Sequence, residues 1–291
     1  MSVKCTFLGL GVMGYPMAGH LVGKGFDVTV YNRTTEKAKK WSQEYGASYA
    51  QTVFEAVRDA DFVFACLGND DDVRSVMYGE KGALAGMKKG AVLVDHTTDS
   101  ADLARELFNA CKERGLGFLD APVSGGQAGA VNGVLTVMTG GEADVFEKAR
   151  PVIESYACNV TLLGEAGSGQ LAKMVNQIAL AGAVQGLSEA VAFGMNAGLD
   201  MKQVLKVLEK GAAGSWQMVN RGETMIEDKF DFGFAVDWMR KDLGIAMAEA
   251  RRNGSSLPVT SLIDQFYAEV QAAGGRRLDT SSLIKRLPRR K

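Results

Sequence analysis

Histidine, cysteine and proline are all scarce in this sequence, and each shortage narrows what the chain can be. Only two histidines occur in 291 residues, His20 and His96, so an enzyme that relies on a histidine acid or base has almost no candidate here. The four cysteines, at positions 5, 66, 111 and 158, have no CxxC spacing, which predicts reduced thiols and no metal site. Five prolines among 35 glycines favour long helices joined by many tight turns.

Excess charge and long apolar runs are also missing. The 33 Lys and Arg residues balance 34 Asp and Glu residues, so the chain lacks the basic excess of a nucleic-acid-binding protein. No uninterrupted apolar run reaches the roughly 18 residues that suggest a membrane span. The first residues, MSVKCTFLGLGVMG, show neither a basic leader nor a small-residue cleavage site. We therefore expect a cytoplasmic protein that binds neither nucleic acid nor membrane.

Short apolar runs alternate with amphipathic stretches in the first half of the chain. Helical patterns such as Thr34–Tyr45 and Ser100–Arg114 separate several of these runs. The alternation predicts an α/β fold with a doubly wound parallel sheet, which we expect to form one domain over residues 1–163. The runs that predict strands are Val3–Leu8, Asp27–Tyr31, Phe62–Leu67, Ala91–Asp95, Leu116–Asp120, Leu135–Thr139 and Val160–Leu163.

The pattern becomes helical after residue 163. Gly167–Met195 is periodic enough to form one long helix. We expect an all-helical second domain, 164–291, with the long helix at the domain junction, where ligand pockets commonly form. The basic tail from Lys285 to Lys291 is expected to be a frayed, solvated end. Further predicted helices are Met201–Glu209, Lys241–Arg252 and Thr260–Ala273.

A glycine motif follows the first predicted strand and opens a helix. Gly9-Leu10-Gly11-Val12-Met13-Gly14 fits G-x-G-x-x-G, in the strand–turn–helix context that makes this short pattern informative. Gly9 would permit the tight turn, Gly11 would let the backbone approach a pyrophosphate, and Gly14 would allow close helix–strand packing. The helix N-terminus offers free N–H groups to the phosphates. The motif therefore predicts a bound NAD(P).

The end of the second strand bears on the choice of cofactor. An Asp or Glu there usually binds the free ribose 2′-hydroxyl of NAD, but this chain has Asn32, Arg33 and Thr34, with Lys37 one turn later. A guanidinium can bind a 2′-phosphate through two hydrogen bonds. We therefore predict NADP(H) over NAD(H), with NAD still possible if Arg33 only stacks on the adenine or points to solvent.

Two later segments carry side chains suited to chemistry. In Asp120–Gly126, the Ser124 hydroxyl and the N–H groups of the glycines could hold a substrate carboxylate, although the segment could also be a plain strand-exit turn. In the long helix, Lys173 is followed at i+3 and i+4 by Asn176 and Gln177, so an ammonium and two amides share one helix face. The alternative for Lys173 is a surface side chain with an apolar stem.

Together these motifs resemble the β-hydroxyacid dehydrogenase family. The family includes 3-hydroxyisobutyrate dehydrogenases, tartronate semialdehyde reductases, and reductases of glyoxylate or succinic semialdehyde. The resemblance implies a Rossmann domain and a helical domain, often assembled as homodimers or homotetramers, and a small carboxylated substrate. Four blocks carry it, in family order and across most of the chain: Phe7–Ala18, Asp120–Gly126, Gly169–Asn176 and Lys241–Leu243.

The resemblance also implies roles for individual residues. Gln177, where many members have Asn, and Gly68, where many have Pro, leave the substrate open. We further expect Trp216 and Phe234 to line the pocket, Phe234 towards the cofactor. The implied roles are Lys173 as the catalytic lysine, Ser124, Gly125 and Gly126 in substrate binding, Asn176 with Gln177 in substrate orientation, and Leu67, Gly68, Thr98 and Lys241 in cofactor binding.

The implied reaction interconverts a small β-hydroxyacid and its semialdehyde or keto acid with NADP(H). An unperturbed lysine has a pKa of about 10.4, and burial would lower it, so we expect oxidation to speed up as the pH rises. The alternatives are an NAD-dependent 3-hydroxyisobutyrate or serine-type dehydrogenase, an imine reductase, and a cofactor-binding module without activity. Lys173 argues against the last two. The substrate candidates are 3-hydroxyisobutyrate, tartronate semialdehyde, glyoxylate, succinic semialdehyde, sulfolactaldehyde and serine.

Overall fold

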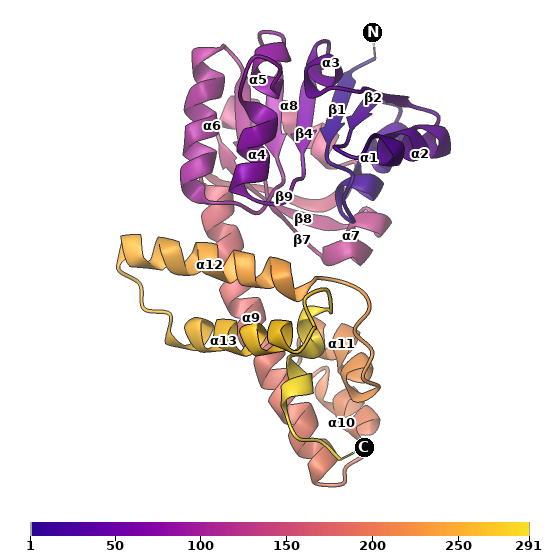
Figure 1. The fold of residues 1–291 in the computed structure, drawn as a ribbon, viewed down its shortest axis with the longest axis vertical. Helices are drawn as coiled ribbons and strands as arrows, with labels where there is room; N and C mark the ends of the chain where they lie inside the picture. Colours follow the sequence, from indigo (N-terminus) through magenta and orange to yellow (C-terminus); the bar gives the residue numbers. More distant parts are fainter. Residues whose placement is uncertain (1, 291) are drawn as a thin grey trace. The chain divides into compact units, whose positions relative to one another are not determined.

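The chain forms two compact units in a computed structural model that describes residues 2–290. Unit 1 extends to Lys173 and unit 2 begins at Met174, so the change of unit lies inside the long helix α9 (Ser168–Asn196). Unit 1 contains a sheet with helices on both faces, and unit 2 is built from helices (Figure 1). The predicted α/β fold with a helical second part is confirmed.

The sheet of unit 1 has nine strands in the order β3-β2-β1-β4-β5-β6-β8-β7, with β9 also paired to β8. From β3 to β6 all pairs are parallel, whereas β8 runs antiparallel to both β6 and β7. The strands are β1 (Lys4–Leu8), β2 (Asp27–Tyr31), β3 (Ser48–Tyr49), β4 (Phe62–Ala65), β5 (Val92–Asp95), β6 (Gly117–Asp120), β7 (Val123–Ser124), β8 (Leu135–Gly141) and β9 (Ala157–Gly164).

The antiparallel junction departs from the expected all-parallel sheet, and the length of the connection explains it. Only residues 125–134 separate β7 from β8, and they form the short helix α7 (Gly126–Asn132). A parallel crossover needs a dozen or more residues. The chain therefore turns back and pairs β8 antiparallel.

Two apolar clusters cover the two faces of the sheet. Consecutive strand residues point to opposite faces, so Phe7 packs in one cluster and Leu8 in the other. The first face is covered by α1 (Gly14–Gly23), α2 (Thr35–Tyr45) and α8 (Ala143–Ile153). The second is covered by α3 (Val53–Val57), α4 (Asp70–Met77), α5 (Ala83–Gly86) and α6 (Ala101–Glu113).

Unit 2 packs shorter helices against α9. Two clusters of buried residues run along α9, one around Ala181 and Val184 and one around Leu187 and Val191. By length and composition α9 could cross a membrane, but a core helix of a soluble protein passes the same test. The remaining elements are α10 (Met201–Leu208), α11 (Trp216–Ile226), α12 (Val236–Asn253), α13 (Pro258–Ala272) and the 3₁₀ helix η1 (Thr280–Arg286).

The basic tail is ordered against unit 2, so the expectation of a frayed end is wrong up to residue 290. Arg286 Nε lies 2.8 Å from Glu269 Oε2, and Arg289 Nη2 lies 3.0 Å from Asp228 Oδ1. Leu283 and Ile284 are completely buried. Apolar burial and matched carboxylates therefore anchor a segment whose charge alone suggested solvation; Lys291 lies outside the described residues.

Candidate active site

Unit 1 gathers its candidate residues at the carboxyl ends of four neighbouring parallel strands. β1, β4, β5 and β6 are adjacent in the sheet, so the turns that follow them lie along the same edge. Open α/β sheets bind their ligands at this edge. The turns contain Gly9–Gly14, Leu67 and Gly68, Thr98, and Asp120–Gly126.

The glycine turn is tight at Gly9 and Gly14 and open at Gly11. Gly9 has a φ of +96°, and a Cβ there would lie 2.5 Å from the carbonyl oxygen of Cys66. A Cβ on Gly14 would overlap the carbonyl oxygen of Gly9. At Gly11, by contrast, no atom lies within 4 Å of the Cβ position, so the space above the turn is open. Two glycines thus keep the turn tight, and the third leaves room for a phosphate.

The end of β2 supports the glycine turn. Asn32 Oδ1 accepts a hydrogen bond from the Leu10 N–H at 3.0 Å, and Asn32 Nδ2 donates to the Thr34 carbonyl at 3.1 Å. The Arg33 side chain is 88% exposed, and its guanidinium lies 3.4 Å from Asp72 Oδ1, in the first turn of α4. Asn32 therefore fixes the turn, while Arg33 remains accessible to a ligand.

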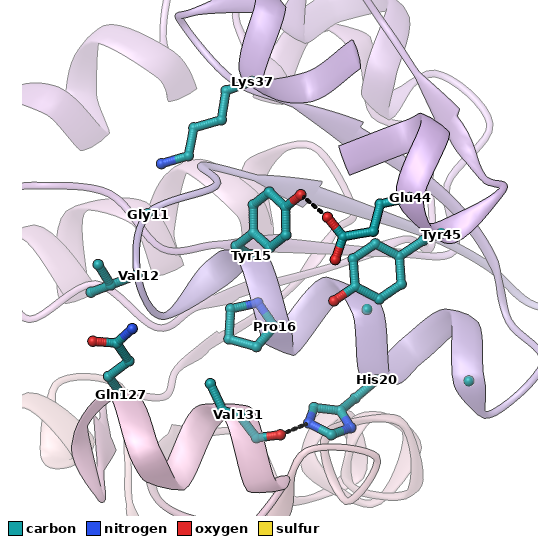
Figure 2. Close-up of a pocket in the computed structure, with 12 residues that line it drawn as sticks. Gly11, Val12, Tyr15, Pro16, His20, Lys37, Glu44, Tyr45, Gln127 and Val131 are labelled. Atoms are coloured by element: carbon teal, nitrogen blue, oxygen red, sulfur yellow. Dashed lines mark hydrogen bonds between the residues drawn. The ribbon is translucent and has the colours of Figure 1, made fainter. Parts of the chain in front are cut away.

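A groove of about 480 Å³ runs beside the glycine turn. Gly11 and Val12 line one end of it, and α1, α2 and α7 supply the rest of its lining. Figure 2 shows the Lys37 side chain extending from α2 towards Gly11. A second cation, besides Arg33, thus lies near the turn.

The turns after β4 and β5 are tied together by Thr97. Its Oγ1 accepts from the Leu67 N–H at 3.0 Å, and its N–H donates to Asp95 Oδ1 at 2.9 Å. Complete burial raises the pKa of Asp95 to about 6. Thr97 is buried and the next residue, Thr98, is half-buried, as are Leu67 and Gly68. The predicted cofactor residues of these turns are therefore partly accessible, and the buried Thr97 connects the two turns.

Asp120 anchors the start of α9 to the strand edge. Its two carboxylate oxygens accept from the Gly167 N–H at 2.8 Å and the Gln170 N–H at 2.9 Å. Gln170 Nε2 donates to the Thr97 carbonyl at 2.7 Å. Burial raises the pKa of Asp120. Neither Asp120 nor Gln170 was predicted to have a role of its own, although both lie inside the motifs that the sequence offered.

The Lys173 amine lies at the Asp120–Gly126 turn. The residue is only 8% exposed, and its Nζ donates to the Val123 carbonyl at 2.9 Å. The next residue, Ser124, is half-buried, and Gly125 and Gly126 are exposed with φ of +126° and +61°. The surface-lysine alternative is thus wrong, because the amine is buried against the backbone of this turn.

Unit 2 holds the next candidate residues in a chain of polar contacts between α9 and α12. Asn176 Nδ2 donates to Gln177 Oε1 at 2.8 Å, and Gln177 Nε2 donates to Asp242 Oδ2 at 2.6 Å. Lys241 Nζ lies 3.2 Å from Asp242 Oδ1 and 5.8 Å from the centroid of the Trp238 ring. The buried Asp242 was not predicted, although it stands in the Lys241–Leu243 block.

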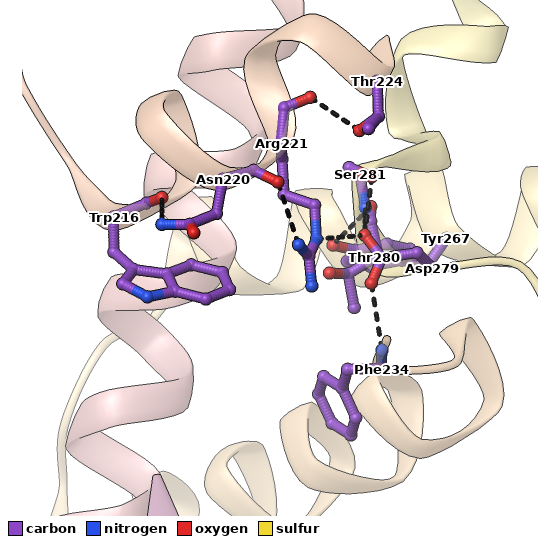
Figure 3. A network of polar contacts seen from close by, with 9 residues as sticks. All are labelled: Trp216, Asn220, Arg221, Thr224, Phe234, Tyr267, Asp279, Thr280 and Ser281. Atoms are coloured by element: carbon purple, nitrogen blue, oxygen red, sulfur yellow. Dashed lines mark hydrogen bonds and ion pairs between the residues drawn. The ribbon is translucent and has the colours of Figure 1, made fainter. Parts of the chain in front are cut away.

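Trp216 and Phe234 border one ion pair in unit 2 (Figure 3). Arg221 Nε lies 3.1 Å from Asp279 Oδ1. The Arg221 guanidinium lies 4.9 Å from the centroid of the Trp216 ring, which is 48% exposed. The Phe234 N–H donates to Asp279 Oδ2 at 2.9 Å. Both aromatic residues are accessible or half-buried, as wall residues would be, but their role stays a prediction.

Comparisons with known families and proteins agree with this arrangement. The family model described as the NAD binding domain of 6-phosphogluconate dehydrogenase matches residues 4–164. The model described as the NAD-binding region of NADP-dependent 3-hydroxyisobutyrate dehydrogenase matches residues 167–287. The two models together cover most of the chain.

Whole-chain relatives fall in the same group. An oxidoreductase of Shewanella frigidimarina is 60% identical, with 98% of each chain covered. The 2-hydroxy-3-oxopropionate reductase of Escherichia coli is 34% identical, with 98% of this chain and 97% of that one covered. The NAD-dependent L-serine dehydrogenase of Pseudomonas aeruginosa is 35% identical, with 97% of each covered.

A solved structure extends the likeness to three dimensions. It is the 3-hydroxyisobutyrate dehydrogenase of Mycobacterium tuberculosis with L-serine, which superposes with a TM-score of 0.87 at 32% identity. The superposition covers 98% of this chain and 99% of that one. The chain therefore belongs to the β-hydroxyacid dehydrogenase family and is an NAD(P)-dependent oxidoreductase that acts on a CH–OH group.

Proposed function

We propose that the enzyme interconverts a small carboxylated β-hydroxyacid and its semialdehyde, with NADP(H) preferred and Lys173 as general acid and base. The buried amine of Lys173 carries the proposal, because it lies 2.9 Å from the Val123 carbonyl. That carbonyl belongs to the residue before Ser124, at the strand edge that also bears the glycine turn. An amine, a hydroxyl and a dinucleotide cradle at one edge are the parts that this reaction needs.

Lys173 supplies the proton chemistry. A nicotinamide held at the strand edge would supply the hydride chemistry. In the direction of reduction, the Lys173 ammonium donates a hydrogen bond to the substrate carbonyl oxygen and then a proton. In the direction of oxidation, the neutral amine accepts the hydroxyl proton. The Val123 carbonyl orients Nζ, and such positioned acid–base groups contribute on the order of 10²–10⁴ in rate.

The substrate is proposed to bind at the Asp120–Gly126 turn and beside Gln177. The Ser124 hydroxyl and the N–H groups of Gly125 and Gly126 can donate to a carboxylate. Asn176 and Gln177 follow Lys173 on α9, and Asp242 holds the Gln177 amide from α12 at 2.6 Å. A restrained amide orients a substrate better than a mobile one. Trp216 is proposed as a wall of this pocket.

The cofactor is proposed to lie along the strand edge from the glycine turn to Thr98. Gly9–Gly14 would hold the pyrophosphate, with Asn32 fixing the turn. Arg33 and Lys37 are the two cations near the end of β2, where a carboxylate would select NAD. They support NADP(H). Residues proposed to complete the site are Thr34, Leu67, Gly68, Phe234 and Lys241.

A panel of carboxylated aldehydes tests the proposal. The purified enzyme is assayed for reduction of tartronate semialdehyde, methylmalonate semialdehyde, succinic semialdehyde, sulfolactaldehyde and glyoxylate, and for oxidation of 3-hydroxyisobutyrate and serine, each with NADP(H) and NAD(H). We expect turnover of at least one compound, faster with NADP(H), and a kcat lower by about 10²–10⁴ for Lys173→Met. Equal turnover by Lys173→Met would contradict the role of the lysine, and a clear preference for NADH would contradict the role of Arg33.

Cytoplasmic location stays a prediction from the composition and the first residues of the sequence, and assembly into a homodimer or homotetramer stays a prediction of the family resemblance. Light scattering of the purified protein measures the assembly state directly.

A further inference from the structure

His96 lies fully inside unit 1, directly after β5, and the proposed reaction does not use it. It is 2% exposed. Its ring stacks on Phe64, with centroids 5.9 Å apart and planes 3° apart, and meets Tyr156 edge-on at 5.5 Å. A buried imidazole between two aromatic rings has one fixed orientation, so its two nitrogens point to defined partners.

Both ring nitrogens of His96 are hydrogen-bonded. Nδ1 lies 2.6 Å from the Ala121 carbonyl oxygen, and Nε2 lies 2.8 Å from the Tyr156 hydroxyl. A carbonyl only accepts, so Nδ1 carries the proton and donates to Ala121. Burial lowers the pKa of His96 to about 4, so the ring is neutral and Nε2 accepts from the Tyr156 hydroxyl. The partners thus assign one tautomer.

The residue that His96 contacts, Ala121, lies in the same turn as Val123, whose carbonyl binds Lys173. Ala121 is two residues before Val123, whose carbonyl accepts from Lys173 Nζ at 2.9 Å. Pro122 stands between them, and its ring fixes one backbone dihedral of the connection. On its other side, Ala121 donates its N–H to the Asp95 carbonyl at 2.7 Å. β8 supports the same segment, since Val123 pairs with Val137 and the Met138 N–H donates to the Pro122 carbonyl at 3.1 Å. Ala121 is therefore one of two supports of the Val123 carbonyl, and the one that lies on the side of His96.

We propose that Tyr156 and His96 form a positioning relay that aims the Val123 carbonyl, and through it the Lys173 amine, at the substrate. Tyr156 holds the ring, the ring holds the Ala121 carbonyl, and residues 121–123 hold the amine. His96 is a positioning residue and touches no reacting atom. The inference rests on the proposed role of Lys173. It goes beyond that role because it assigns the chain's buried histidine and Tyr156 to the rate of the chemical step.

Four variants test the relay by their effect on kcat. His96→Phe keeps the ring and removes both hydrogen bonds. His96→Asn keeps a donor at the Nδ1 position, whereas His96→Gln places its amide at the Nε2 position. Tyr156→Phe removes only the bond to Nε2. Because misplacement by about 1 Å costs around 10²-fold in rate, we expect His96→Phe to lower kcat about 10- to 100-fold. KM and the NADPH dissociation constant should change less than about threefold.

The kcat values of His96→Asn and His96→Gln show whether His96 positions the Ala121 carbonyl or only fills space in the core. We expect His96→Asn to recover most of kcat and to exceed His96→Gln about tenfold, with Tyr156→Phe between the wild type and His96→Phe. If His96→Phe does not fold, the Asn-to-Gln ratio decides. The matched control is Thr6→Val, since the buried Thr6 hydroxyl also donates to a backbone carbonyl, that of Ala56 in α3, and has no proposed role in binding or chemistry; its kcat should stay at the wild-type value.

Failure of the relay and failure of the proposed function give different results. If Lys173→Met is inactive while His96→Phe, His96→Gln and Tyr156→Phe all turn over at the wild-type kcat, the relay is wrong and the proposed function stands. Equal kcat for the folded Asn and Gln variants also overturns the relay. If Lys173→Met keeps the wild-type kcat, the proposed role of Lys173 is wrong, and the relay, which depends on that role, is wrong with it.

Discussion

The two units hold their candidate residues by different means. In unit 1 the residues stand on turns at strand ends, and backbone groups make most of the contacts: the Leu10 N–H to Asn32, the Gly167 N–H to Asp120, and Lys173 to the Val123 carbonyl. In unit 2 the residues stand on helix surfaces and are held by other side chains, as Gln177 is by Asp242. Substitutions in unit 1 should therefore disturb the backbone and act strongly. Substitutions in unit 2 should remove single side-chain contacts and have smaller effects on stability.

Of the variants that probe the contrast between the two units, Gly9→Ala should have the largest effect, because it should lower both stability and NADPH binding. Its Cβ would meet the Cys66 carbonyl at 2.5 Å in a residue with φ of +96°. Such strain costs on the order of 1–3 kcal/mol, which corresponds to a melting temperature lower by roughly 2–10 °C. The displaced turn should also weaken NADPH binding by at least about tenfold. Thermal melting and a fluorescence titration with NADPH measure the two effects.

Gly11→Ala is the matched control for that variant. The Cβ position at Gly11 has no atom within 4 Å, so the variant should melt like the wild type and lose only affinity for NADPH. If Gly9→Ala melts and binds like the wild type, the backbone of unit 1 is more adaptable than its contacts indicate, and the contrast with unit 2 disappears.

A smaller effect is expected from Gln177→Ala in unit 2. Lys241 still pairs with Asp242 in this variant, so the fold should persist. If Gln177 orients the substrate as proposed, loss of its restrained amide should lower kcat/KM about 10- to 100-fold, the range for hydrogen bonds of about 1–3 kcal/mol. Steady-state kinetics measure it. Gln185→Ala, which removes a hydrogen bond from the Gln185 amide to Glu189 on the same helix α9, serves as control; equal losses in both variants would count against the assignment of Gln177.

Arg33→Ala should change cofactor preference with little effect on stability. The Arg33 side chain is 88% exposed and its pair with Asp72 is a surface contact, which contributes about 0–1 kcal/mol. Loss of the guanidinium should weaken NADPH binding about tenfold and leave NADH binding unchanged. Asp72→Asn should tighten NADPH binding slightly. Isothermal titration with both cofactors measures this, and parallel losses for NADPH and NADH would contradict a 2′-phosphate contact.

The smallest net effect concerns stability between pH 4 and pH 6.5, where two buried groups of unit 1 oppose each other. Burial lowers the pKa of His96 to about 4, so its contribution is full above pH 6.5 and is lost as the pH falls towards 4. Burial raises the pKa of Asp95 to about 6, so its contribution is present below pH 3.8 and is lost as the pH rises through 6. Each is worth up to about 3 kcal/mol.

Urea unfolding at pH 4.5 and pH 7 separates these two groups. The wild type is the reference, because Asp120, whose pKa burial also raises, titrates in all three proteins. Compared with the wild type, Asp95→Asn should lose stability on going from pH 7 to pH 4.5, and His96→Asn should gain stability. The same acid dependence in both variants would show that neither group titrates as its burial indicates.

The sequence predicted best where one local pattern determined the structure. Apolar runs located β1, β2, β4, β5, β6, β8 and β9, and the glycine spacing located the tight turn between β1 and α1. The periodicity of Gly167–Met195 predicted α9, which spans Ser168–Asn196. In these segments the pattern of apolar residues and glycines within a few positions is enough to predict whether the chain forms a strand, a turn or a helix.

Features that depend on distant partners were not predictable. The strand β7 is two residues long, and the antiparallel junction follows from a short connection that no apolar pattern marks. Asp120 holds the start of α9 some 47 residues away, and the carboxylates of Glu269 and Asp228 order the basic tail. Single residues in the sequence carry no sign of such pairings. Lys173 was recognised by its motif, but its burial against Val123 required the fold.

Chemical rescue of Lys173→Ala tests the central claim most directly. If the amine of Lys173 transfers the proton, the variant should lose about 10²–10⁴ in kcat while its NADPH dissociation constant stays within about twofold of the wild-type value. Methylamine added at millimolar concentration should then restore part of kcat in proportion to its concentration, and not in the wild type. A Lys173→Ala enzyme with wild-type kcat, or one that has lost NADPH binding together with turnover, would contradict the account.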